Sequence, residues 1–171
     1  MKYPEYYAQF FTATILEWKH LLKPDKYKDI ILDSLRYLTT EKRVKVFAFV
    51  VMSNHIHLMW QIQPDNTLED VQRDFLKFVA QKIKYDLVKN HPAVLEMFRV
   101  DAKDRKYQFW ERNPLSIDLY THEVFKQKLE YIHQNPVAAG ICTFPEQYKY
   151  SSAKLYYTGV NDYEFITHLF D

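Results

Sequence analysis

The stretch V-K-V-F-A-F-V-V-M-S-N-H-I-H-L-M-W-Q-I, at residues 44–62, decides the fold. Val44 to Met52 is a continuous run rich in β-branched and aromatic residues, which predicts a central strand buried on both faces. Ser53 and Asn54 predict a tight turn, and His55 to Ile62 then returns as the next strand. The stretch therefore predicts an antiparallel hairpin within a sheet.

The segments on either side of this hairpin alternate between strand and helix patterns. Aromatic and β-branched runs predict strands, whereas apolar residues at three- and four-residue steps predict helices. The expected elements are a strand at Gln9–Glu17, a helix at Lys26–Thr39, a long helix from Thr67 to about Asn90, a strand around Tyr107–Glu111 and a last long helix that follows Thr121 and reaches about Gln134. This order predicts an α+β fold: a ferredoxin-like antiparallel sheet (βαββαβ) with an added C-terminal helix. We expect the core helices to cover one face of the sheet and to leave the other face free.

Length and composition set limits on the class of protein. The 171 residues, 47% of them hydrophobic, suit a single domain over residues 1–171. The formal net charge is only +1, so any DNA binding must be local rather than a bulk attraction. The longest apolar run, residues 46–52, is too short to cross a bilayer, and Cys142 is the only cysteine. We expect a cytoplasmic protein with no membrane role.

Basic residues gather in two stretches of the sequence. Lys42 and Arg43 belong to the first, and Arg105, Lys106 and Arg112 belong to the second. Both stretches are interleaved with acidic residues, so a solvated charged face and a DNA-binding surface are both open interpretations. These five residues are the candidate DNA contacts.

His55 and His57 are alternate residues of a predicted strand and therefore share one face, whereas Ile56 and Leu58 point the other way. At about 3.3 Å per residue, their Cα atoms lie about 7 Å apart, a span that two neutral imidazoles can close around one metal ion. A histidine pair on its own is more often a surface or hydrogen-bonded pair. We expect the apolar set to face the helices and both imidazoles to emerge on the free face.

The last predicted helix carries the second candidate group. Tyr131 and Asn135 are four residues apart and therefore lie on one side of the helix. At about 100° per residue, they border its apolar stripe, whereas His133 lies on the opposite flank. Pro136 ends regular helix hydrogen bonding. Each residue alone fits a structural role, as a boundary tyrosine or a helix terminus, so only the combination with the imidazoles indicates chemistry.

Three segments carry a resemblance to a known family: V-M-S-N-H-I-H-L-M at residues 51–59, F-W-E-R at 109–112 and Y-I-H-Q-N-P-V-A-A-G-I at 131–141. In their order and spacing, the sequence resembles the single-tyrosine HUH transposases, and especially the REP-associated tyrosine transposases. The resemblance covers nearly the whole chain, from the first strand to Y-K-Y-S-S at 148–152. The first and third motifs together are highly specific.

The resemblance implies a role for each candidate residue. The family's two metal-binding histidines fall on His55 and His57, and its nucleophile falls on Tyr131. Insertion-sequence members carry Gln four residues after the tyrosine, whereas this chain has Asn135, as the REP-associated branch does. We expect the shorter amide to reach the metal only through water. Family members use magnesium or manganese, and Mn²⁺ suits imidazole ligands at least as well as Mg²⁺.

The implied function is a metal-dependent single-stranded DNA endonuclease and strand transferase that forms a 5′-phosphotyrosine intermediate at hairpin-associated sites. Single-stranded DNA with hairpins is the expected partner, and no nucleotide cofactor is expected. Insertion-sequence relatives are dimers, whereas some REP-associated relatives act as monomers, so a homodimer is one open possibility. Two alternatives are a domesticated protein that binds hairpin DNA or RNA without cutting and a structural or small-molecule-binding ferredoxin-like module. The intact set of His55, His57, Tyr131 and Asn135 argues against both.

Overall fold

One four-stranded antiparallel sheet organises the part of the chain that the structure, a computed structural model, describes: residues 7–170. Its strands are β1 (Ala8–Thr14), β2 (Val44–Val51), β3 (His55–Ile62) and β4 (Leu115–Asp118). The order across the sheet is β2-β3-β1-β4, and each neighbouring pair is antiparallel. This arrangement confirms the ferredoxin-like α+β fold.

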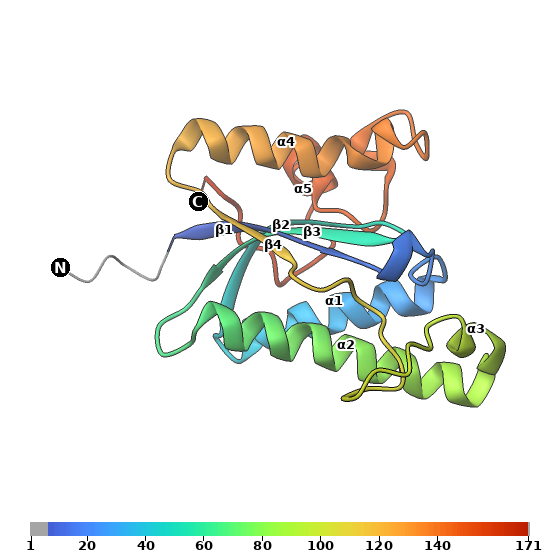
Figure 1. Ribbon diagram of the computed structural model, residues 1–171. Helices are drawn as coiled ribbons and strands as arrows, with labels where there is room; N and C mark the ends of the chain where they lie inside the picture. Colours follow the sequence, from blue (N-terminus) through green and yellow to red (C-terminus); the bar gives the residue numbers. More distant parts are fainter. Residues whose placement is uncertain (1–6, 171) are drawn as a thin grey trace.

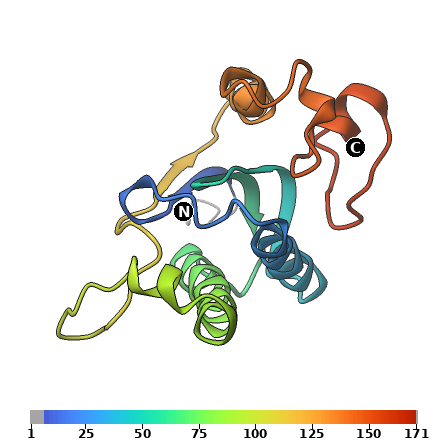
Figure 2. The same cartoon turned by 90° about the vertical axis from the view of Figure 1, so that its right-hand side faces the viewer.

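Helices cover both faces of the sheet. The helices α1 (Asp25–Thr40) and α2 (Leu68–Asn90) lie on one face, and α4 (His122–Ala138) lies on the other (Figures 1 and 2). We name these the α1–α2 face and the α4 face. The expectation of a free face was therefore wrong. Phe10 and Met59 on the sheet form a second apolar cluster with Leu129 and Ile132 of α4. This packing removes the apolar side chains of that helix from water.

A bulge in β2 changes which of its residues face each side of the sheet. The pairing register with β3 shifts between Val46 and Ala48. As a result Val46 and Phe49 both belong to the core of the α1–α2 face, whereas Ala48 and Val50 belong to the cluster under α4. The predicted burial on both faces is confirmed, but the predicted central position is wrong, because β2 is the end strand of the order β2-β3-β1-β4.

The shorter elements are η1 (Leu16–Trp18), α3 (Pro92–Glu96), η2 (Pro145–Gln147) and α5 (Ala153–Thr158). The segment after α4 runs along the outer edge of β2, where the N–H of Val51 donates to the carbonyl of Tyr150 at 2.9 Å. Farther along, the N–H of Thr167 donates to the carbonyl of Val46 at 2.8 Å. This segment occupies backbone groups that an edge strand would otherwise expose. Among residues 7–170, none of the helices combines the length and apolarity needed to cross a membrane.

The strand predicted around Tyr107–Glu111 is not where the fourth strand forms. Trp110 makes only an isolated bridge with Ile15, and the indole N–H of Trp110 donates to the carbonyl of Leu76 in α2. The aromatic residues are buried here because they pack against α2. A buried loop can be as rich in aromatic residues as a strand, so composition alone does not distinguish the two. The fourth strand, β4, alternates between exposed and half-buried residues and gives only a weak sequence signal.

Two predicted element ends also differ from the structure. The first strand ends at Thr14, because Glu17 (φ 55°) and Trp18 (φ 57°) take left-handed backbone conformations that turn the chain. The last helix continues past Gln134 to Ala138, with Pro136 inside it. A proline removes only its own N–H from the helix, so one further turn can still form around it.

Candidate active site

The two imidazoles lie side by side at the start of β3, directly after the predicted turn. The ring centroids of His55 and His57 are 4.8 Å apart. His57 is only 5% exposed, because it lies beneath α4 and stacks on Phe10 with a centroid distance of 5.2 Å. The pair therefore shares one face of the strand as predicted, but that face is covered.

A separate side chain holds each imidazole in place. The Nδ1 of His57 lies 2.7 Å from the hydroxyl of Thr12, on the neighbouring strand β1. The Nδ1 of His55 lies 2.7 Å from the Oδ1 of Asn54, in the turn. Because Oδ1 can only accept, the neutral His55 ring carries its proton on Nδ1 and keeps a lone pair on Nε2. Such partners orient metal-binding imidazoles in other proteins.

Burial keeps both imidazoles in the form that binds metals. Burial, together with the charges of the nearby His55 and Lys128, lowers the pKa of His57 to about 3. Burial also lowers the pKa of His55, and a hydrogen bond with the Asn135 side chain opposes that shift. Both rings are therefore neutral at neutral pH, and only a neutral imidazole offers a lone pair to a cation.

The helix α4 brings Tyr131 to the imidazoles within a single chain. The ring centroids of Tyr131 and His57 are 5.3 Å apart, and those of Tyr131 and Phe10 are 5.9 Å apart. Tyr131 is 52% exposed, so a large substrate can reach its hydroxyl. The expected meeting of phenol and imidazoles is observed, whereas the role of each residue stays a prediction.

Asn135, one turn after Tyr131, hydrogen-bonds to His55, so its carboxamide lies beside the imidazole pair. In residues 7–170 no group of three or more His, Cys, Asp or Glu side chains could hold a metal ion. A cation bound by His55 and His57 would thus take Asn135 or water as a further ligand. Borderline divalent cations such as Mn²⁺ accept such mixed nitrogen and oxygen ligands, so the residues fit the predicted metal.

His133 lies on the opposite flank of α4, as predicted from its helical position. Its Nε2 is 2.7 Å from the hydroxyl of Ser152, and its side chain is 2% exposed. Burial lowers the pKa of His133 to about 4. This histidine therefore joins α4 to the C-terminal segment and lies outside the candidate site.

Lys42 and Arg43 lie away from the imidazoles. They precede Val44, which pairs with Ile62 at the opposite end of β3 from His55. The guanidinium of Arg43 lies 2.9 Å from Asp74 and also donates to Asn66, so it links the sheet to α2. The structure does not bring these two residues to the site, and their role as DNA contacts stays a prediction.

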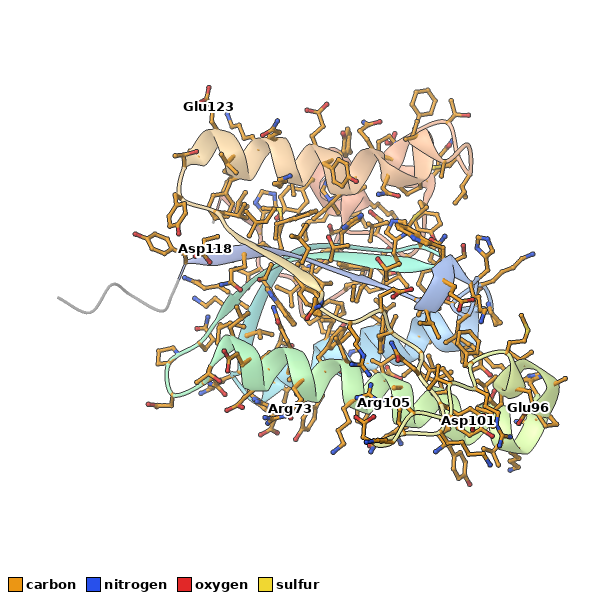
Figure 3. The ribbon with its side chains drawn as sticks, in the orientation of Figure 1. Arg73, Glu96, Asp101, Arg105, Asp118 and Glu123 are labelled. Atoms are coloured by element: carbon orange, nitrogen blue, oxygen red, sulfur yellow. The ribbon has the colours of Figure 1, made fainter. Side chains whose placement is uncertain are left out.

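Arg105 and Arg112 line a groove of about 390 Å³ on the α2 side of the molecule, together with Arg73, Tyr107 and other residues. Figure 3 shows Arg73 and Arg105 there, across the sheet from Glu123 of α4. Lys106 does not line this groove, but its Nζ is 5.6 Å from the ring of Tyr107, which does. The second basic stretch thus forms a basic and aromatic groove, which we name the α2 groove.

The α2 groove approaches the site at one end of β1. The N–H of Glu111 donates to the carbonyl of Thr14, and Thr14 pairs with His55 across the sheet. Beside this junction, Trp18 is 60% exposed, and its ring centroid is 6.0 Å from that of His55.

Sequence reasoning missed four residues around the site: Thr12, Trp18, Asn54 and Lys128. Asn54 precedes His55 directly, and Lys128 lies three positions before Tyr131, so local spacing could have indicated both. The position of Thr12 beside His57 depends on the pairing of β1 with β3. The position of Trp18 beside His55 depends on a left-handed turn. Neither carries a local signal in the sequence.

Comparisons with known proteins identify the family of this chain. The family model described as "Transposase IS200 like" matches residues 7–135. A solved structure of a REP-associated tyrosine transposase bound to a REP hairpin has a TM-score of 0.66 and 16% identity, and the match covers 100% of this chain and 94% of that chain. A protein of Deinococcus radiodurans R1 assigned as a transposase has a TM-score of 0.48 and 15% identity, over 77% of this chain and 92% of that chain. No curated protein matches the sequence. Because the family model spans most of the chain, this protein belongs to the IS200-like transposase family.

Proposed function

We propose that this transposase-family protein cuts and rejoins single-stranded DNA beside hairpins, with Tyr131 as the covalent nucleophile. The observation that carries the proposal is the position of the Tyr131 ring, 5.3 Å from the ring of His57 in the same chain. The phenol is half-exposed, whereas His57 is buried and held by Thr12. An accessible nucleophile thus lies beside a fixed pair of ligands.

The reaction is a transesterification at one phosphodiester. The phenolic oxygen of Tyr131 attacks phosphorus, so that a new P–O bond forms while the bond to the 3′ oxygen breaks. The phenol releases its proton to solvent and the leaving 3′ oxygen takes one up, so charge and protons balance. The DNA remains attached to Tyr131 through its 5′ phosphate, and a 3′ hydroxyl is released.

The covalent bond explains the choice of tyrosine over water. A phosphotyrosine ester keeps the free energy of the broken phosphodiester, so a later 3′ hydroxyl can reverse the step without ATP. Attack by water would leave a 5′-phosphate monoester on the DNA end and make the cut irreversible. The geometry therefore suits joining as well as cutting.

His55, His57 and Asn135 would hold a divalent cation, which relieves negative charge on the non-bridging oxygens during attack. The Nδ1 partners of both imidazoles fix the rings, and Asn135 contacts His55. We expect Mn²⁺ or Mg²⁺ at this position. The neutral state of both rings supports the assignment because no proton has to leave before the cation binds.

The α2 groove supports a DNA substrate. Arginines can hold the phosphates of a single strand, and aromatic rings such as Tyr107 can stack on bases. Arg73 and Arg105 are paired with acidic neighbours, but both are exposed, and surface ion pairs are weak enough to exchange for phosphate. The relative with a similar fold was solved with a REP hairpin, which makes hairpin DNA the first substrate to test.

The test is a denaturing gel of protein incubated with labelled single-stranded hairpin DNA and Mn²⁺. We expect a covalent adduct with the unaltered protein and none with Tyr131→Phe or in excess EDTA. Tyr157→Phe is a matched control, because Tyr157 is 50% exposed and lies beside a histidine, His133, outside the site. An adduct that persists in Tyr131→Phe would overturn the nucleophile. A native-gel shift without any adduct would instead assign the protein to non-cutting hairpin binding.

A further inference from the structure

Lys128 places a cation inside the candidate site. It lies one helical turn before Tyr131, on the same side of α4. Its Nζ is 4.8 Å from the ring centroid of Phe10 and 5.7 Å from that of Tyr131. Its charge is also one of the causes that lower the pKa of His57. The ammonium therefore lies among the phenol, the imidazoles and the sheet.

No carboxylate neutralises this cation in the part of the chain that the structure describes. Ion pairs occupy other basic side chains, among them Arg43, Arg73 and Lys154, whereas the contacts found for Lys128 are to aromatic rings. The positions three and four residues away on α4 hold only Val124, Phe125, Tyr131 and Ile132. An i,i+4 ion pair on the helix is therefore impossible.

The site needs positive charge at this position. Within residues 7–170, Lys128 is the basic side chain found over the ring of Tyr131, with its Nζ 5.7 Å from the ring centroid. A phosphodiester brings one negative charge, which concentrates on its non-bridging oxygens during attack. Lys128 lies on the α4 side, with the nucleophile, whereas His55 and His57 approach from the sheet.

We infer that the Lys128 ammonium binds a non-bridging oxygen of the phosphate that Tyr131 attacks. The inference rests on the proposed function and adds a phosphate-binding residue to it. The resting contact with Phe10 keeps the ammonium beside the phenol, and the four-carbon stem lets it move to an incoming oxygen. The charge then holds the phosphate in line with the phenol and offsets the charge that develops during attack.

The main competing role for Lys128 is structural, because its stem packs on Phe10. Lys128→Met keeps an unbranched stem of similar length and removes only the charge, and Lys128→Arg keeps the charge. Lys126→Met is the matched control, because Lys126 lies two positions earlier on α4 and lines a pocket beside His133 and Tyr157 instead. All variants need melting temperatures like that of the unaltered protein, and Lys128→Gln replaces Lys128→Met if the latter does not fold.

The first measurement is the single-turnover rate of adduct formation with saturating hairpin DNA and Mn²⁺. We expect Lys128→Met to slow this rate about 100-fold, as removal of one charge-stabilising donor does elsewhere. Lys128→Arg should recover most of the rate, and Lys126→Met should leave it unchanged. A Lys128→Met rate equal to that of the unaltered protein overturns the inference. If the unaltered protein forms no adduct, the result contradicts the proposed function and not the role of Lys128 in particular.

The second measurement needs neither cleavage nor a metal. In the Tyr131→Phe background and in EDTA, the affinity for hairpin DNA is measured against salt concentration. Adding Lys128→Met should reduce the slope of log affinity against log salt by about 0.7, the value for one phosphate contact on a single strand. A purely structural lysine would leave the slope unchanged, and an unchanged slope contradicts the inference. In the first measurement, a Lys128→Arg rate as low as that of Lys128→Met also contradicts it.

Discussion

The two faces of the sheet are built differently, although they share every strand. The α1–α2 face has a large and mainly apolar core, in which Phe11, Leu58 and Trp60 are fully buried. The α4 face has a smaller apolar cluster, and His55, His57 and Lys128 adjoin it. The first face supplies most of the hydrophobic stabilisation. The second face carries polar groups that a stable core alone would not need.

This difference shows how one strand can serve stability and chemistry at once. Because side chains alternate along β3, His57 lies between Ile56 and Leu58, whose side chains anchor the strand from the opposite face. The imidazole is therefore positioned by a core to which it does not belong. We expect stability and activity to respond separately when the two faces are altered.

The largest expected effect comes from truncating neighbouring residues of β3. Leu58 faces α1 and α2, whereas Met59 faces α4, and both are fully buried. We expect Leu58→Ala to lower the free energy of unfolding by about 4 kcal/mol and Met59→Ala by about 2 kcal/mol, because the smaller cluster can collapse onto the gap. Urea unfolding measures both values. Equal losses would show that the two faces are equally tightly packed.

A smaller effect is expected from pH, through His133. Its pKa in the folded protein is about 4, below the ordinary value of 6.5. The unfolded chain therefore binds a proton between these values that the folded chain does not, and stability falls as the pH drops through this window. Between pH 7 and pH 5 we expect this residue to account for a loss of about 2 kcal/mol. Thermal melts of His133→Gln should show a shallower pH dependence, and an unchanged one would contradict the prediction.

The smallest effect should come from Thr12, which holds His57 from the neighbouring strand. Thr12→Val keeps the shape of the side chain and removes the hydroxyl. Loss of such an orienting partner typically weakens a metal site 10- to 100-fold, and we expect about 10-fold here. Calorimetric titration with Mn²⁺ measures the change. Thr39→Val, on α1 across the sheet, serves as the control and should bind Mn²⁺ as the unaltered protein does.

Sequence reasoning was most accurate where the signal is local. The hairpin from Val44 to Ile62 and the four-residue spacing of Tyr131 and Asn135 follow from short-range periodicity. Sequence reasoning failed where tertiary packing determines the local structure. The strand β4 is short and half-exposed, Trp110 is buried in a loop, and α4 covers a face that the pattern of β3 alone leaves open.

The segment that follows α4 restricts how two copies of this chain could join. Its backbone bonds to Val46 and Val51 occupy groups on the outer margin of β2, so a neighbouring molecule could extend the sheet there only after peeling this segment away. The opposite margin is β4, at Leu115–Asp118, which offers only a few backbone groups. A homodimer would therefore be expected to assemble through helices or loops, leaving the sheet of each copy separate.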